Sequence, residues 1–216
     1  MTLETFARRL TLAAVASVSL VAAADNPKDP PKAPPATSPT KAAADTTVVD
    51  SRSPKLSDVD LQVLAHVHHS DMMEVKAGKL AMNKAADKRV KAIGKMLVDD
   101  HGSDARMVLS MVGKRGQVLP DMKPFDEAEK ADLQLADATM AKLDELQGRD
   151  FDREFLRAQV AMHDKALAKL DLEIAQIKDN PDLVQMLRND RPVLEKHKQN
   201  AQLMLGVEAG NEGERK

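Results

Sequence analysis

The 216-residue chain has no cysteine, tryptophan or tyrosine and only 4 phenylalanines. Without cysteine it can form no disulfide, iron–sulfur cluster or thiolate metal site, and it lacks the residue that anchors a lipoprotein. The formal net charge of −2 gives no basic surface, and few aromatic side chains are present to stack on bases. We therefore expect no nucleic-acid partner.

The sequence also lacks the motifs of most enzymes. It shows no alternating strand pattern, no glycine-rich phosphate loop and no Ser-His-Asp or paired-carboxylate arrangement. The abundant residues are alanine, leucine, lysine, aspartate and methionine, most of which favour helix. This composition predicts an all-α protein and favours a function other than catalysis.

Residues 1–24 are typical of an export signal. Arg8 and Arg9 precede an apolar run over residues 10–23, and the alanines at 22–24 fit a cleavage site followed by the mature chain. The run is shorter than the roughly 20 residues that a spanning helix needs. We expect cleavage, a location in the periplasm or cell envelope and no remaining transmembrane segment, with an uncleaved anchor as the alternative.

The next segment, residues 25–56, holds most of the proline together with alanine, threonine, serine and lysine. Such a composition cannot bury a core, so we predict a disordered linker that can associate the protein with the envelope. A helical domain follows over residues 57–206, and residues 207–216 form a polar tail.

Within the domain, apolar spacings of three and four predict helices over the ranges 58–85, 88–114, 127–147, 151–178 and 181–206. Expected capping residues are Ser57 with Asp60, Asp87, Asp126, Asp150 or Asp152, and Asn180 ahead of Pro181. Pro192 should kink or split the last helix. The four long helices predict a four-helix bundle, with the short helix in the connection between its second and third helices.

Four polar residues on the apolar stripes of the long helices suggest a site. Glu74 and His101 lie at equal distances from the first predicted turn, and His163 and His197 from the second. In antiparallel hairpins such residues face each other, so one polar group per helix should meet near the middle of the bundle. On the first helix, Ser70 is placed on the same inward stripe as Glu74.

This set predicts a metal site. Imidazole and carboxylate ligands suit one divalent transition metal ion such as Zn, Fe or Mn. Asp100 and Asp164, each next to a histidine, are candidates for second-shell partners or alternative ligands. The alternative is that the inward histidines form only a hydrogen-bonded polar network between helices.

Other candidate ligands are weaker. His66, His68 and His69 could bind metal, but we interpret them as partly exposed helix residues. The 12 methionines are spread over all the helices, as expected for core packing rather than copper handling. A ferritin-type di-iron site needs Glu-x-x-His, and the positions three before the site histidines are Val98, Val160 and Leu194.

Several segments resemble a known family. They are "EVKAGKLA" (74–81), "VKAIGKMLVDDH" (90–101), "GQVLP" (116–120), "GRDFDREFLRAQVAMHDKAL" (148–167) and the pairing of Pro192 with His197. They resemble a bacterial family of exported proteins of unknown function, grouped with ferritin-like bundles and often described as membrane or outer-membrane proteins. The resemblance covers about residues 58–205 and implies a ferritin-like bundle, export and recurrent polar positions at the four site residues. "HVHHSD" departs from the small residues that the family carries there.

Three functions follow for testing. The first is an exported bundle that binds a metal ion through Glu74, His101, His163 and His197. The second is a non-catalytic structural or interaction module near the envelope. The third is a ferritin-like oxidase, which the missing Glu-x-x-His motif disfavours.

Overall fold

The computed structural model describes residues 54–213, with side-chain surroundings over residues 54–206. The described chain forms helices and no strand: α1 (Asp58–Lys84), α2 (Lys88–Lys114), α3 (Glu127–Glu145), α4 (Gly148–Gln176) and α5 (Pro181–Gly213). The all-α fold class is confirmed. The predicted export signal and nearly all of the predicted linker lie outside the described residues.

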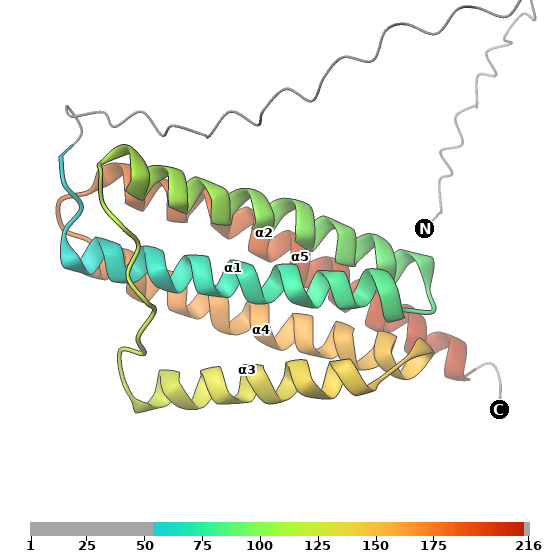
Figure 1. Cartoon of the computed structure of the whole chain (residues 1–216). Helices are drawn as coiled ribbons and strands as arrows, with labels where there is room; N and C mark the ends of the chain where they lie inside the picture. The colour runs from blue at the N-terminus through green and yellow to red at the C-terminus, as the bar shows by residue number, and fades with distance from the viewer. Residues whose placement is uncertain (1–53, 214–216) are drawn as a thin grey trace, which may run out of the picture. The chain divides into compact units, whose positions relative to one another are not determined.

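The four long helices form a bundle in which each helix runs antiparallel to both neighbours (Figure 1). α1 packs against α2 and α4, while α5 packs against α4 and α2. Residues 115–126 lead from α2 to α3, which lies outside the four-helix arrangement against α4 and α1 (Figure 1). The predicted extra helix therefore carries the chain back along the bundle, so that α4 can start beside the end of α1.

Short polar side chains start most of the helices. Ser57 and Asp60 form a reciprocal capping box, in which each side chain accepts from the other's backbone N–H at 3.1 Å. Asp87, Asp126 and Asn180 accept from the first turns of α2, α3 and α5. These predicted caps are confirmed, and each satisfies a backbone donor that the helix itself leaves unpaired.

The start of α4 differs from the prediction. The helix begins at Gly148, whose φ of 61° lies in the left-handed region and lets the chain turn sharply out of α3. Asp152 is therefore inside α4 and not a cap of it. Its buried carboxylate accepts from the backbone N–H groups of Ala86 and Asp87 at 3.0 and 2.9 Å, which fixes the α1–α2 turn onto α4.

The last helix is also longer than expected. α5 continues without interruption through Pro192 to Gly213, so the prediction that proline could split it is wrong. Proline removes one backbone donor, whose loss leaves the carbonyl of Arg188 without its intrahelical partner. The helix passes the predicted end at residue 206 and enters the predicted tail.

Two hydrophobic clusters fill the bundle, one toward each end. The first is centred on Leu97, Phe151 and Phe155, and the second includes Val108, Leu183 and Leu187. Along every long helix, the polar site residue falls between residues of the two clusters. The bundle therefore has a polar layer enclosed between two apolar cores.

α1 and α2 approach closely beside this layer. A Cβ added at Gly78 would lie 2.5 Å from the carbonyl oxygen of Gly94, and one added at Gly94 would lie 2.7 Å from the Cβ of Ala81. Only glycine fits either position without displacing backbone. The contact fixes the spacing of the two helices that carry Glu74 and His101.

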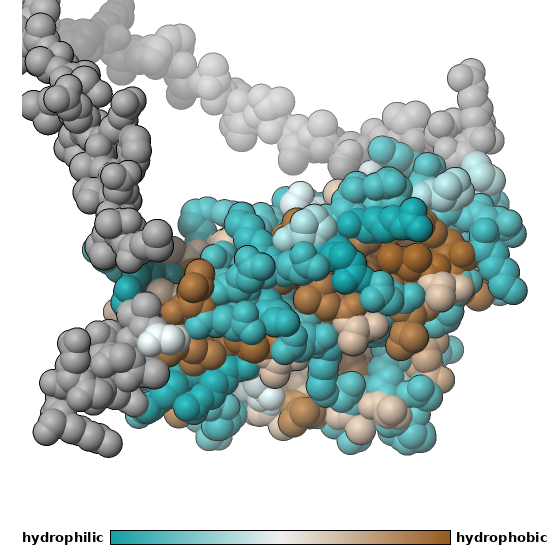
Figure 2. Space-filling view, turned by 180° about the vertical axis from the view of Figure 1, so that it is seen from behind, coloured by the Kyte–Doolittle hydropathy of each residue, from teal (hydrophilic) through white to brown (hydrophobic). Residues whose placement is uncertain are grey.

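The outer surface is mixed in character. The face opposite that of Figure 1 shows hydrophobic residues in patches among hydrophilic ones (Figure 2). Between residues 54 and 213, none of the helices combines the length and the apolar character needed to cross a membrane.

Candidate metal centre

Three histidines from three helices meet in the polar layer. His101 on α2, His163 on α4 and His197 on α5 are all buried, with at most 5% of each residue exposed. One ring nitrogen of each lies within 4.8 Å of those of the other two. Among the described residues, these three histidines are the set whose ligand atoms lie close enough together to bind one metal ion.

The hydrogen bonds of the rings determine which nitrogens are free. His163 Nδ1 lies 2.9 Å from the backbone carbonyl of Gln159, which can only accept, so this nitrogen carries the proton. His197 Nε2 donates to Asp100 Oδ2 at 2.9 Å. The remaining nitrogens, His163 Nε2 and His197 Nδ1, then face each other at 3.3 Å with lone pairs when both rings are neutral.

The third ring completes the pattern. His101 Nδ1 donates to Asp71 Oδ1 at 2.9 Å, and His101 Nε2 is buried with no hydrogen-bond partner within the described chain. Each histidine thus uses one nitrogen on an outer acceptor and turns the other inward. This is the arrangement of metal-ligating histidines, whose second nitrogen is oriented by a carboxylate or carbonyl.

The electrostatics keep two of the rings neutral. Burial lowers the pKa of His163, and burial also lowers the pKa of His197 to about 4 despite its hydrogen bond to Asp100. At His101 burial acts in the same direction, but the hydrogen bond to Asp71 and the charge of Glu74 outweigh it and raise the pKa. Burial raises the pKa of Asp71 to about 6, even though its bond to His101 opposes the shift.

Glu74 brings a carboxylate to the same layer. Its Oε1 lies 3.8 Å from His163 Nδ1, and its Oε2 is buried without a hydrogen-bond partner in the part of the chain described. The side-chain amide of Gln159, one turn before His163, is likewise buried with both polar atoms unpaired. Unpaired buried polar atoms are costly, and Glu74 and Gln159 bring such atoms to the same region of the bundle as His163.

The structure thus brings together the three histidines that sequence spacing selected, whereas Glu74 lies beside His163 and is not part of that group. The two aspartates proposed as further partners lie in different surroundings. Asp100 contacts His197 directly. Asp164 is exposed and pairs with Lys198 at 2.5 Å, because it lies on the outer side of α4, so it has no place in this layer. The assignment of the four residues as metal ligands stays a prediction.

Sequence reasoning missed Asp71, which is buried and holds His101. The predicted stripe placed Ser70 on the inward face of α1 instead, but Ser70 is exposed in the structure. The available signal was the spacing of Asp71 and Glu74, three residues apart on one face of α1.

The interpretation of His66 was also wrong, since only 2% of this residue is exposed. Its ring stacks on Phe125 at a centroid distance of 4.1 Å, and its Nε2 donates to the carbonyl of Lys123 at 2.7 Å. Its Nδ1 lies 2.7 Å from the ammonium of Lys169. His68 and His69 are half-buried, in line with the prediction.

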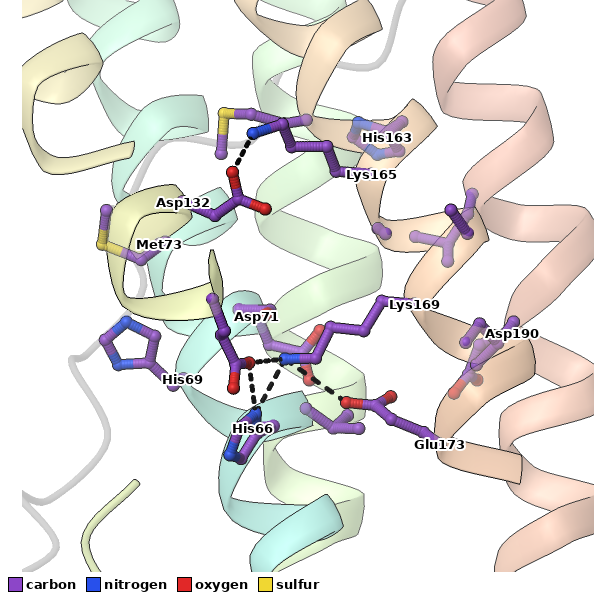
Figure 3. Close-up of a pocket in the computed structure, with 18 of the residues that line it drawn as sticks. His66, His69, Asp71, Met73, Asp132, His163, Lys165, Lys169, Glu173 and Asp190 are labelled. Carbon is purple, nitrogen blue, oxygen red and sulfur yellow. Dashed lines mark hydrogen bonds and ion pairs between the residues drawn. The ribbon is translucent and has the colours of Figure 1, made fainter. Parts of the chain in front are cut away.

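His66 belongs to an ionic cluster that joins α3 to the bundle. Lys169 on α4 also pairs with Glu129 on α3 and with Glu173 at 3.5 Å, and Lys165 pairs with Asp132 on α3 (Figure 3). Burial raises the pKa of Glu173 to about 7, an effect that Lys169 partly offsets. This cluster closes one end of a cavity of about 520 Å³ that reaches the polar layer.

Comparison with known proteins agrees with this architecture. A crystal structure of a DUF305 fragment from Deinococcus radiodurans superposes with a TM-score of 0.61 at 18% identity, over 71% of this chain and 99% of that fragment. At this identity the likeness shows the fold alone, which is the helical ferritin-like fold. No curated protein matches the sequence. The family model described as "Domain of unknown function (DUF4142)" matches residues 45–204, and the chain therefore belongs to the DUF4142 family.

Proposed function

We propose that this protein is an exported helical bundle that holds one divalent transition metal ion at His101, His163, His197 and Glu74. The observation that carries the proposal is the convergence of three buried ring nitrogens whose partner nitrogens are already bonded to outer acceptors. A cation at their centre would turn the facing lone pairs of His163 and His197 from a repulsive contact into a stabilising one.

The donor set indicates the class of metal. Three imidazoles and one carboxylate suit Zn²⁺, Fe²⁺ or Mn²⁺, and the absence of cysteine excludes a thiolate site. One carboxylate and three histidines match a single ion better than a di-iron centre, which requires several bridging glutamates. The bound ion would supply a Lewis acid within a closed layer, and metal retention is the role we assign to it.

Export is supported by the sequence of residues 1–24, with paired arginines ahead of a short apolar run and small residues. The proline-rich segment after it would tether the domain within the envelope. We place the protein in the periplasm or at the envelope on these grounds.

Metal analysis tests the proposal. The chain, purified without a histidine tag, should contain close to one equivalent of metal by plasma mass spectrometry. His101→Ala and His163→Ala should lose that metal, while His68→Ala, at a half-buried position outside the layer, should keep it. Metal-free protein whose melting temperature does not change when Zn²⁺, Fe²⁺ or Mn²⁺ is added would refute the proposal.

A structural role without metal is the second candidate, and the hydrogen bonds between helices favour it. Asp71–His101 joins α1 to α2, and Asp100–His197 joins α2 to α5. The ring of His163 on α4 packs edge-to-face against that of His197 on α5, with a centroid distance of 5.4 Å. If these bonds are the whole function, His163→Ala should destabilise the chelator-treated protein as much as the untreated one. If metal is the function, the loss should be larger in the untreated protein.

A further inference from the structure

We propose that the cavity beside the polar layer binds a small organic amine, with its ammonium group among Asp71, Asp104 and Asp190 and its hydrocarbon body along the apolar walls. The cavity adjoins the proposed metal centre, because Glu74, His101 and His163 are among its lining residues, but the amine would contact carboxylates outside the proposed ligand set and does not need a bound metal. At about 520 Å³ the cavity is within the range of small-molecule sites.

The charges of the cavity are unevenly compensated. Lys169 pairs with both Glu129 and Glu173, and Figure 3 shows its contact with Glu173. Asp104 on α2 and Asp190 on α5 also line the cavity, and neither has a lysine or arginine partner in the described structure. The buried ring of His101 is the one basic group there that acts electrostatically on both of them. An uncompensated carboxylate that is partly withdrawn from water is costly, so this part of the cavity favours a cation.

A deeply buried atom points to the same ligand. Asp71 is 6% exposed, lines the cavity, and uses only Oδ1 on His101. Its Oδ2 has no hydrogen-bond partner within residues 54–206. An N–H donor placed in the cavity would satisfy this acceptor, and an ammonium group offers three such donors.

The apolar residues that line the rest of the cavity favour an organic cation over a metal ion. Most of the lining is apolar and comes from α1, α3, α4 and α5, including Val67, Met73, Leu133, Met162, Leu187 and Leu194. Among the described residues, the histidines of the polar layer have ligand atoms near enough to share one ion, and the three aspartates do not form such a group. A ligand with a charged end and an apolar body fits both features.

Hexylamine and 1-hexanol provide a matched pair of probes, because they share the hydrocarbon chain and differ in charge. We would titrate each into chelator-treated full-length protein labelled with ¹³C at the methionine methyl groups. Hexylamine should bind saturably and shift the resonances of Met73 and Met162 but not that of Met107, which is exposed and outside the cavity. Hexanol should cause no saturable shift in the same range.

Variants then test the carboxylates. Asp190→Asn and Asp104→Asn should each weaken hexylamine binding about tenfold or more, since a partly buried ion pair loses one partner. Asp99→Asn, at an exposed position on α2, should leave it unchanged. The inference is overturned if hexanol binds as well as hexylamine, if both cavity variants keep full affinity, or if Mg²⁺ produces the methionine shifts and hexylamine does not. Because the protein is metal-free throughout, these outcomes are independent of the metal content at the histidines.

Discussion

Asp100 on α2 and His197 on α5 lie 2.9 Å apart, and their hydrogen bond determines which nitrogen of His197 faces the centre of the bundle. The carboxylate accepts from Nε2 and leaves Nδ1 free toward His163. It also joins α2 to α5, as does the weaker bond from Asn200 Nδ2 to Met96 Sδ at 3.5 Å one turn away. Asp100 therefore orients His197 in the proposed site, as Asp71 orients His101.

Replacing Asp100 with asparagine should weaken metal binding by about 10- to 100-fold, the usual cost of losing an outer partner of a ligating histidine. The amide can donate as well as accept, so it no longer enforces one tautomer of His197. Competition with a calibrated chelator measures the change. Asp99→Asn alters the adjacent, exposed residue, which pairs with Lys95, and should leave affinity intact. Equal losses in both variants would count against the role of Asp100.

The metal-free protein should show a histidine-dependent loss of stability in acid. The pKa of His197 is about 4 in the folded chain and about 6.5 when unfolded, so the unfolded state binds more protons between these values. Above pH 6.5 the imidazole of His197 is neutral in both the folded and the unfolded state, so its burial carries no protonation cost. As the pH falls toward 4, protonation of the unfolded state lowers the free energy of unfolding. Each pKa unit is worth about 1.4 kcal/mol, so the shift sets an upper limit of about 3.5 kcal/mol on the effect.

His197→Gln should remove this dependence. Urea denaturation at pH 7 and pH 4 should show that the variant loses less stability on acidification than the parent. The comparison of variants is needed because Asp71, Glu173 and Asp190 have raised pKa values and titrate in the opposite sense. Identical pH profiles for His197→Gln and the parent would contradict the prediction, and His68→Gln serves as the control.

Gly78→Ala should destabilise the bundle by roughly 1–3 kcal/mol, the usual cost of overpacking. The new methyl group would meet the backbone of Gly94 at 2.5 Å, which outweighs the gain in helix propensity of up to about 1 kcal/mol. Gly206→Ala, near the end of α5 with no atom within 4 Å, should be neutral or slightly stabilising. Denaturant unfolding of both variants measures the difference, and equal stability would show that α1 and α2 separate easily.

Glu129→Ala should loosen the amino-terminal half of α3. The carboxylate accepts from the backbone of Phe125 at 2.6 Å and pairs with Lys169 and His66, whereas the buried residues of α3, Met140 and Leu143, lie near its other end. Hydrogen exchange over residues 121–135 should accelerate about tenfold or more. Glu127→Ala removes an exposed carboxylate that pairs with Lys130 and should have little effect. Unchanged exchange in Glu129→Ala would show that apolar contacts alone hold α3.

Much of the fold was predictable because short turns join helices of similar length. Counting outward from the turns at Asp87 and Asn180 placed His163 level with His197, and their rings lie 5.4 Å apart. The same count brought Glu74 to the level of His101. The caps were also predictable, since they depend on local hydrogen bonds that short polar side chains make wherever a helix starts.

Residues that depend on rotation or on docking were harder to predict. Neighbouring helix positions are about 100° apart, so an error of one position exchanged the buried Asp71 for the exposed Ser70. His66 is buried by Phe125 and the adjoining connection, and α3 buries too few residues for a periodic pattern to show where it packs. Asp152 looked like the start of a helix, and its role in the α1–α2 turn required the tertiary structure.

The donors of the polar layer are divided between the two hairpins, with Glu74 and His101 in the first and His163 and His197 in the second. Neither hairpin holds more than two of them, and His197 lies on α5, which follows the other described helices in the chain. If the proposed metal site exists, a chain that lacks the second hairpin would hold only two of its donors and would bind the ion weakly. Metal binding would then require the whole bundle to be folded. The compartment in which folding is completed would therefore determine which ion is bound.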